Sequence, residues 1–330
     1  MPVRSEMNTI LGLIRDAKRV LVSSHENPDG DAIGSTLALG LGMEQMGKEV
    51  VFYNKDGVPE ILRFLPHSDR IVKSLQGIEG TFDLVFAVDC TGTNRAGREF
   101  EDFLSAGRCG KVIIMDHHQT NNSSADLHLL DPSSSSTGMI VYSVLKQLPV
   151  EINSDIAGNI YTTIIGDTGS FRYSNTNPDT FRVAAELVEH GADPAEISEA
   201  LFESEPLRKL KLIGLVLPTL EVSGDKKIAS VYVDKNMFAQ TGACREDTEG
   251  IVNIPRSIKG VEVAVLFREE IDKDGSLWKV SFRSKGQVDV AKVAEGFGGG
   301  GHYRAAGCSL AGDLDEVKKR VFESVREVLP

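Results

Sequence analysis

The first half of the chain alternates between short apolar runs and longer stretches with helical periodicity, and this alternation constrains the fold more than any other feature. Apolar strands separated by helices are typical of a mostly parallel sheet with both faces covered. The predicted strands are residues 19–24, 49–53, 83–88 and 111–115. The predicted helices are residues 7–17, 32–47, 136–148, 153–165 and 178–190. We therefore predict an α/β fold with a mostly parallel, doubly wound sheet.

The second half of the chain has a different pattern. Residues 192–222 have mainly helical periodicity, and strand patterns return only after them. The strands predicted there are residues 227–234, 261–269 and 276–284, and a final helix is predicted at 313–328. A chain of 330 residues favours two domains. We predict a first domain over 1–195, a helical linker over 196–220 and a smaller mixed α/β domain over 221–330.

Charge and composition narrow the class of ligand and the compartment. A net charge of −12 disfavours a protein that coats long nucleic acid, whereas a small anion still binds where metals, Arg and Lys supply local positive charge. The four cysteines are scattered without a CxxC pair, as expected in a reducing cytosol. The sequence shows neither a signal-peptide core nor an apolar run of about 18 residues. We predict a soluble, cytoplasmic protein without membrane contact.

Acidic and imidazole side chains follow three of the predicted strands. In open α/β sheets, sites form beyond the carboxyl ends of the strands, so these groups are expected to converge. Another carboxylate follows the predicted helix 153–165. The residues at these four places are His25, Asp29 and Asp31; Asp89; Asp116, His117 and His118; and Asp167.

The types of side chain in these clusters predict a metal site. Asp and His suit hard or borderline divalent cations, and two cations that share a carboxylate polarise a phosphoryl group. Six of the residues suffice as ligands for a pair of ions: His25, Asp29, Asp31, Asp89, His117 and Asp167.

Each cluster also has a simpler interpretation. The segment 27–30 by itself fits an ordinary turn, and 116–118 by itself fits a helix cap with solvated imidazoles. The four serines at 133–136 are interpreted as a loop before a helix N-cap at Ser136 or Thr137. Coincidence is a poor explanation for four such clusters at successive element ends, and we favour one joint site.

A glycine tract near the C-terminus is the second signal. Consecutive glycines let the backbone approach a ligand and expose its amides, and a helix that starts near His302 would favour an anion there. Alone, the tract fits a flexible loop and the nearby basic residues fit a solvated strand edge. Together they predict a phosphate or nucleotide pocket. Its predicted substrate-binding residues are Gly298, Gly299, Gly300, Gly301, His302 and Arg304, with Arg283, Ser284 and Lys285.

With these motifs the sequence resembles the DHH phosphoesterase family over nearly its whole length. The matching motifs are His25-x-Asn-Pro-Asp29-x-Asp31-Ala32, Val88-Asp89, Asp116-His117-His118, Asp167, and Gly298-Gly-Gly-Gly-His302 with Arg304-Ala-Ala-Gly307. Within the family, the two-domain form without further modules is most similar to the nanoRNase and pAp phosphatase (bifunctional oligoribonuclease) subfamily.

The resemblance implies a centre of two divalent metal ions. Mn²⁺ is the expected ion, and Mg²⁺, Co²⁺ and Zn²⁺ are the alternatives. His25, Asp29 and Asp89 would hold one ion. Asp31, Asp89, His117 and Asp167 would hold the other, so that Asp89 bridges. The implied catalytic pair is His118, which faces the scissile phosphate or protonates the leaving oxygen, and Asp116, which orients a neighbouring His. His302, Arg283 and the glycine tract would grip the substrate.

The implied activity is hydrolysis of short oligoribonucleotides to mononucleotides, dephosphorylation of 3′-phosphoadenosine 5′-phosphate (pAp) to AMP, or both. The alternatives are a phosphodiesterase for linear pApA or cyclic-di-AMP, a manganese pyrophosphatase, a RecJ-like single-strand exonuclease, and a nucleotide sensor without catalysis. The expected partners are short RNA or nucleotides, without binding of long nucleic acid, and base rates favour a homodimer. The sequence leaves the preferred substrate, the cleavage polarity, the metal and the oligomeric state open.

Overall fold

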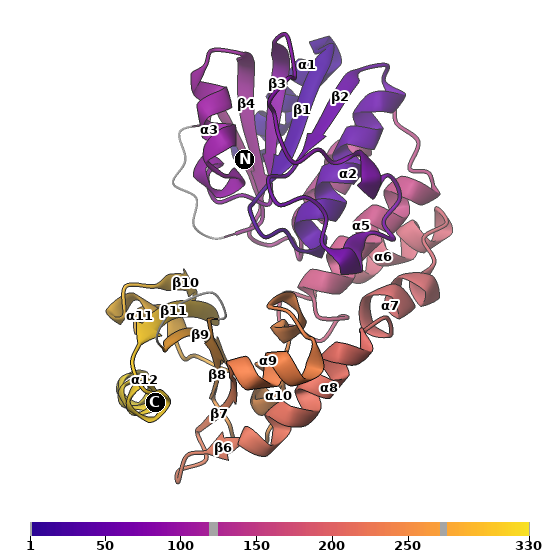
Figure 1. Ribbon diagram of the computed structural model, residues 1–330. Coiled ribbons are helices and arrows are strands. Elements are labelled where there is room, and N and C mark those ends of the chain that lie inside the picture. Colours follow the sequence, from indigo (N-terminus) through magenta and orange to yellow (C-terminus); the bar gives the residue numbers. More distant parts are fainter. Residues whose placement is uncertain (1, 119–124, 271–275, 330) are drawn as a thin grey trace. The chain divides into compact units, whose positions relative to one another are not determined.

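Two separate β-sheets organise the chain, one in each of the two units into which it divides, Met1–Ser204 and Glu205–Pro330. The computed structural model describes residues 2–118, 125–270 and 276–329 (Figure 1). The residues predicted as a linker, 196–220, include part of α7 (Pro194–Phe202), α8 (Leu207–Val216) and the 3₁₀ helix η4 (Leu217–Thr219). The predicted domain limits themselves stay a prediction.

The first sheet has five strands in the order β2-β1-β3-β4-β5, and every neighbouring pair is parallel. Its strands are β1 (Arg19–Ser24), β2 (Glu49–Tyr53), β3 (Phe82–Val88), β4 (Cys109–Asp116) and β5 (Leu127–Leu130). The first four confirm the predicted strands. The short edge strand β5 escaped prediction because its four residues, mostly half-buried, include a histidine and lack a long apolar run.

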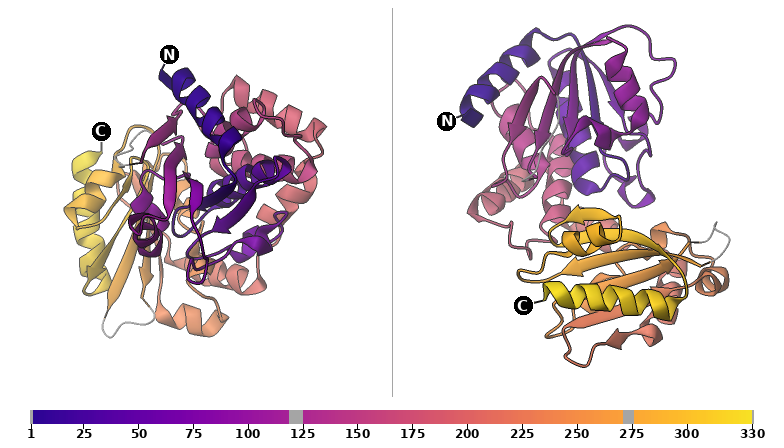
Figure 2. Two further views of the ribbon diagram at one scale, coloured as in Figure 1. Left: turned by 90° about the horizontal axis from the view of Figure 1, so that it is seen from above. Right: turned by 90° about the vertical axis from the view of Figure 1, so that its left-hand side faces the viewer.

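Helices cover both faces of this sheet, as predicted for a doubly wound fold (Figure 2). Alternate strand residues divide between the faces. Val20 and Val22 join the core formed with α1, α2, α4 and α5, whereas Leu21 joins Phe100 of α3 in a second core. These helices are α1 (Pro2–Asp16), α2 (Gly30–Gln45), α3 (Arg98–Ser105), α4 (Thr137–Leu145) and α5 (Ser154–Asp167).

The remaining elements of the first unit are short or peripheral. They are α6 (Pro178–Glu189) and the 3₁₀ helices η1 (Glu60–Leu62), η2 (Ser68–Arg70) and η3 (Thr93–Ala96). Helix α6 begins with a capping box, in which the Asn177 side chain accepts from the Thr180 amide and the Thr180 hydroxyl accepts from the Asn177 amide. The helix predicted at 178–190 therefore begins where the structure has it, at Pro178.

Helices α2 and α5 pack unusually closely. A Cβ atom on Gly34 of α2 would lie 2.6 Å from the backbone oxygen of Asn159 in α5, so only glycine permits this approach. Asp31 is in the first turn of α2 and Asp167 is the last residue of α5. The close contact therefore fixes the start of one helix relative to the end of the other.

The second sheet is mixed and has the order β10-β11-β9-β8-β7-β6, in which only β7 and β8 are parallel. Its strands are β6 (Glu221–Val222), β7 (Ile228–Val233), β8 (Val263–Glu269), β9 (Leu277–Ser284), β10 (Gly300–His302) and β11 (Ala305–Ala311). Helices α11 (Val290–Gly296) and α12 (Leu314–Val328) pack on one face. Helices α8, α9 (Lys235–Thr241) and α10 (Asn253–Arg256) cover the other, and η5 (Glu246–Thr248) lies between α9 and α10 in the chain.

The glycine tract does not lead into a helix, so the expectation of a helix N-terminus near His302 is wrong. His302 ends β10, and β10 pairs antiparallel with β11. The alternating burial of Ala306, Cys308 and Leu310 in β11 gives the physical reason, because a period of two favours a strand. Within residues 2–118, 125–270 and 276–329, no helix is long and apolar enough to cross a membrane.

Candidate metal centre

The predicted metal-binding residues of the first unit meet beyond the carboxyl ends of the strands, at the point where the strand order reverses. His25 follows β1 and Asp89 follows β3, the two strands on either side of the reversal. Asp116 is the last residue of β4. Ligand sites of open α/β sheets form beyond the carboxyl ends of the strands at this point.

His25, Asp29 and Asp89 form one group in which the ligand atoms lie within 4.8 Å of one another. The His25 Nε2 atom is 3.3 Å from Asp89 Oδ2. Asp29 is also the N-cap of α2, where its Oδ1 accepts from the amides of Asp31 and Ala32 at 3.0 and 3.1 Å. Asp29 is therefore both the cap of a helix and a member of the cluster.

Asp31, His117 and Asp167 form a second group of the same size. The His117 Nε2 atom lies 3.6 Å from Asp31 Oδ2 and 3.3 Å from Asp167 Oδ2. Asp31 is fully enclosed, and each of the other two is partly accessible. These three residues come from α2, the segment after β4, and α5, so the packing of α2 against α5 assembles the group.

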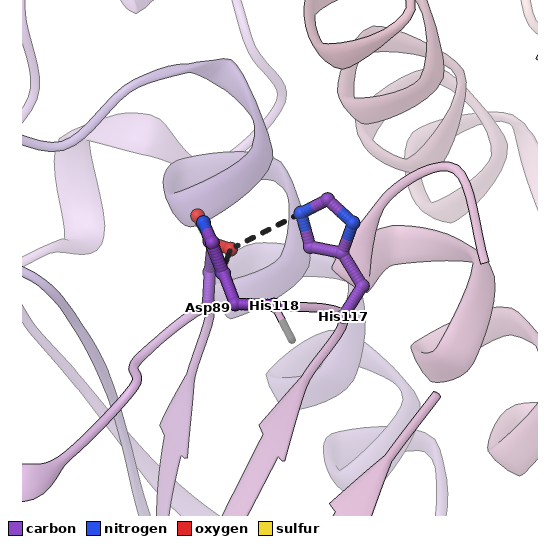
Figure 3. Close-up of side chains that lie close together, drawn as sticks. All are labelled: Asp89, His117 and His118. Carbon is purple, nitrogen blue, oxygen red and sulfur yellow. Dashed lines mark ion pairs between the residues drawn. The ribbon is translucent and has the colours of Figure 1, made fainter. Parts of the chain in front are cut away.

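Asp89, His117 and His118 make a third group, drawn in Figure 3. Asp89 Oδ1 is 3.9 Å from His117 Nε2 and 3.6 Å from His118 Nδ1. The His118 Nδ1 atom is also 2.6 Å from Asp116 Oδ1, which in addition accepts from the His118 amide. Asp116 is completely buried, and its carboxylate contacts the site through His118.

Asp89 is common to two of the three groups and has an unusual backbone. Its φ is +54°, in the left-handed region that few residues other than Gly, Asn and Asp adopt. Its amide donates to the Met115 carbonyl at 2.9 Å, which ties this turn to β4. Strained backbone held by its surroundings is frequent at functional sites.

The first turn of α4 contacts two of the carboxylates, a feature that the sequence did not reveal. The Thr137 amide donates to Asp31 Oδ2 at 2.8 Å, and the Gly138 amide donates to Asp31 Oδ1 at 3.0 Å. The Thr137 hydroxyl donates to Asp89 Oδ1 at 3.1 Å. The serine-rich segment before this helix was the available signal, but it predicted only the N-cap, which is Ser136.

Burial and the repulsion between neighbouring carboxylates disfavour the ionised forms of Asp31 and Asp167. Burial raises the pKa of Asp31 well above its usual range, and the nearby charges of Asp89, Asp167 and Asp29 raise it further. Burial likewise raises the pKa of Asp167 to about 7. A divalent cation in each group would supply compensating positive charge, so the donor set fits metal ions.

The pKa values of two histidines, His118 and His25, are raised as well. Burial lowers the pKa of His118, but its hydrogen bond with Asp116 and the charges of Asp116 and Asp89 raise it to about 9. The pKa of His25 is raised for a similar reason, because contact with Asp89 outweighs burial. In the metal-free site these imidazoles are therefore biased toward the protonated form.

The predicted substrate residues of the second unit lie in one region of its sheet. Strand pairing matches His302 with Ala305, and Ala305 with Arg283 of β9, so the three backbone positions share a row. The Ser284 hydroxyl is buried and donates to the Val288 carbonyl at 2.7 Å. The Lys285 ammonium donates to the Ile258 carbonyl at 3.1 Å.

The glycine tract approaches other backbone closely. A Cβ on Gly299 would lie 2.2 Å from the Gly307 oxygen, and one on Gly301 would lie 2.5 Å from the Ala305 oxygen. The fold therefore requires glycine at positions 299 and 301, whether or not a ligand binds there. Gly298 and Gly300 have open space at that position, and Arg304 lies exposed between β10 and β11.

Comparison with protein families gives two matches. The DHH family, N-terminal domain, matches residues 19–164, and the DHHA1 domain matches residues 225–328. The first match contains His25, Asp89 and His117, and the second contains Arg283 and His302.

Individual relatives are similar over nearly the whole chain. The bifunctional oligoribonuclease and PAP phosphatase NrnA of Thermus thermophilus is 36% identical, over 94% of this chain and 90% of its own. The protein of that name from Bacillus subtilis is 28% identical, over 88% of this chain and 89% of its own. The crystal structure of an exopolyphosphatase-related protein from Bacteroides fragilis has a TM-score of 0.92 at 27% identity, covering 98% of this chain and 96% of that one.

Proposed function

The chain belongs to the DHH family of phosphoesterases, and from this membership we propose that it hydrolyses short oligoribonucleotides to mononucleotides and pAp to AMP. One observation of the site carries the proposal. Asp89 is shared between ligand groups that meet at the switch point of the sheet, as a bridging carboxylate between two metal ions would be. The relatives whose names state both activities extend over nearly the whole chain.

We propose that His25, Asp29 and Asp89 hold one ion and that Asp31, Asp89, His117 and Asp167 hold the other. When bound, two such ions would supply the charge that polarises a phosphoryl group and would activate water for in-line displacement. Oxygen and imidazole donors suit Mn²⁺, with Mg²⁺, Co²⁺ and Zn²⁺ as alternatives. The absence of thiolates from both groups favours the harder ions of this series.

We propose that His118 donates a proton to the oxygen that leaves phosphorus. Its Nδ1 lies against Asp116, so the transferred proton would be held at Nε2. Burial lowers the pKa of His118, but in the metal-free site contact with Asp116 and Asp89 raises it to about 9, which favours a protonated ring there. Asp116 would fix the ring orientation, since it is buried and its Oδ1 is only 2.6 Å from the ring.

For the substrate we propose contacts from the second unit through Arg283, Arg304, His302 and the glycine tract. Arginine binds phosphate by paired donors, and glycine amides can donate to an anion at close range. A net charge of −12 opposes long polyanions and supports a preference for short ones. The cytoplasm, where short RNA and pAp are available, is the compartment we propose.

A panel of phosphate esters tests the function. The purified protein is assayed with Mn²⁺ on pAp, pApA, RNA of two to five nucleotides, a long RNA, pyrophosphate and cyclic-di-AMP, each with and without chelator. We expect mononucleotides from the short RNAs and phosphate from pAp, with little action on the long strand and none in chelator. Preference for pyrophosphate, cyclic-di-AMP or the long RNA would favour an alternative in the family, and no turnover of any compound would favour the sensor.

A further inference from the structure

We propose that Thr137 is a positioning residue of the metal centre, whose hydroxyl orients the Asp89 carboxylate so that each of its oxygens faces a different ligand group. The inference rests on the proposed function, because it concerns the same centre. It gives the first residue of α4 a role beyond that of starting the helix.

The contacts of Asp89 divide between its two oxygens. Oδ2 faces His25, at 3.3 Å from Nε2. Oδ1 faces the other side, at 3.6 Å from His118 and 3.9 Å from His117, and it accepts the Thr137 hydroxyl at 3.1 Å. Thr137 is fully buried and Asp89 nearly so, so water does not compete readily for this hydrogen bond.

A bridging carboxylate needs such a partner. The terminal torsion of an Asp side chain is broad, and the repulsion between neighbouring carboxylates does not define one orientation. A donor on one lone pair of Oδ1 fixes the carboxylate plane and leaves a further lone pair on each oxygen. The bridge is then ready before an ion binds, and the ordering cost at binding falls.

Thr137 is itself held rigidly. Its amide donates to Asp31 at 2.8 Å, so one residue contacts a carboxylate from α2 and the carboxylate after β3. The next residue, Gly138, leaves no room for a side chain, because a Cβ there would lie 2.0 Å from the Thr163 hydroxyl oxygen in α5. The first turn of α4 thus sits between the elements that provide the ligands.

The test compares Thr137→Val, which removes the hydroxyl at nearly constant shape, with Thr137→Ser, which retains it. Mn²⁺ binding to the metal-free full-length protein is followed by the EPR signal of the free ion. We expect Thr137→Val to weaken binding by about 10–100-fold, the usual effect of losing a partner of a metal ligand. Thr137→Ser should bind close to wild type. With Mn²⁺ saturating, Thr137→Val should lower kcat on a diribonucleotide and leave KM unchanged.

Ser136→Ala provides the matched control, because it removes the cap hydroxyl of the same helix, which accepts from the Met139 amide at 3.4 Å. It should lower thermal stability in chelator and leave Mn²⁺ affinity unchanged. Wild-type affinity in Thr137→Val overturns the inference, as does an equal loss in Ser136→Ala. If Thr137→Val does not fold, Thr137→Ala is judged by the same criteria. Wild-type protein that binds no Mn²⁺ would contradict the proposed function instead, so the two failures are distinct.

Discussion

At the scale of single residues, the centre is built from side chains that each meet two demands. Asp29 caps α2 and belongs to a ligand group, and Asp89 adopts a left-handed backbone while it contacts three histidines. Local patterns predicted these residues as members of one site because their types and order are visible in the sequence, and the structure brings them together. The contacts of Thr137 were not visible, because its partners are distant in the chain.

Asp89→Asn tests the bridge at this scale. Asn also tolerates the left-handed backbone, so the fold should persist, but the amide lacks the second anionic oxygen. We expect kcat on a diribonucleotide to fall by at least about a hundredfold, since even indirect partners of metal ligands contribute up to that factor. Steady-state kinetics in saturating Mn²⁺ provide the measurement. Asp155→Asn, which alters a carboxylate paired with His67, is the control and should keep full activity. Normal kcat in Asp89→Asn would remove Asp89 from the mechanism.

At the scale of elements, the packing of α2 and α5 determines whether Asp31 and Asp167 meet. Strand and helix positions followed from apolar periodicity, which is why the four long strands of the first sheet were predicted correctly. The hairpin of β10 and β11 was not predicted, since a run of glycines carries no periodicity of its own. The close helix contact at Gly34 was also hidden, because it depends on which residue of α5 faces it.

Gly34→Ala should separate α2 from α5. The added Cβ would lie 2.6 Å from a backbone oxygen, and backbone cannot yield as a side-chain end does. We expect the free energy of unfolding to fall by about 1–3 kcal/mol, as in other overpacked cores. Denaturant unfolding in chelator measures it. Gly158→Ala within α5 is the matched control, because its Cβ would meet nothing within 4 Å, and it should stabilise by up to about 1 kcal/mol. Equal effects of the two substitutions would disprove the close approach.

At the scale of the whole molecule, the chain combines two units, each with its own sheet and its own cores. The ligand groups found among the described residues all lie in the first unit. The predicted substrate residues lie in the second. From the positions of its motifs, the sequence predicts a metal site in the first unit and substrate contacts in the second.

Mn²⁺ should therefore stabilise one unit more than the other. A ligand that binds only the folded state adds about 2.7 kcal/mol when its concentration is a hundred times its dissociation constant. We expect calorimetry of the full chain to show a transition of the first unit that moves to higher temperature with Mn²⁺. The transition of the second unit should stay in place. An unchanged first transition, or a shift of the same size in Asp89→Asn, would contradict this account.

The most direct test of the central claim is anomalous diffraction at the manganese edge from crystals grown with Mn²⁺. We predict two anomalous peaks, about 3.5–4 Å apart, with the Asp89 carboxylate between them. His25 and Asp29 should contact one peak, and Asp31, His117 and Asp167 the other. A single peak, or a pair of peaks that Asp89 does not join, would contradict the two-metal centre.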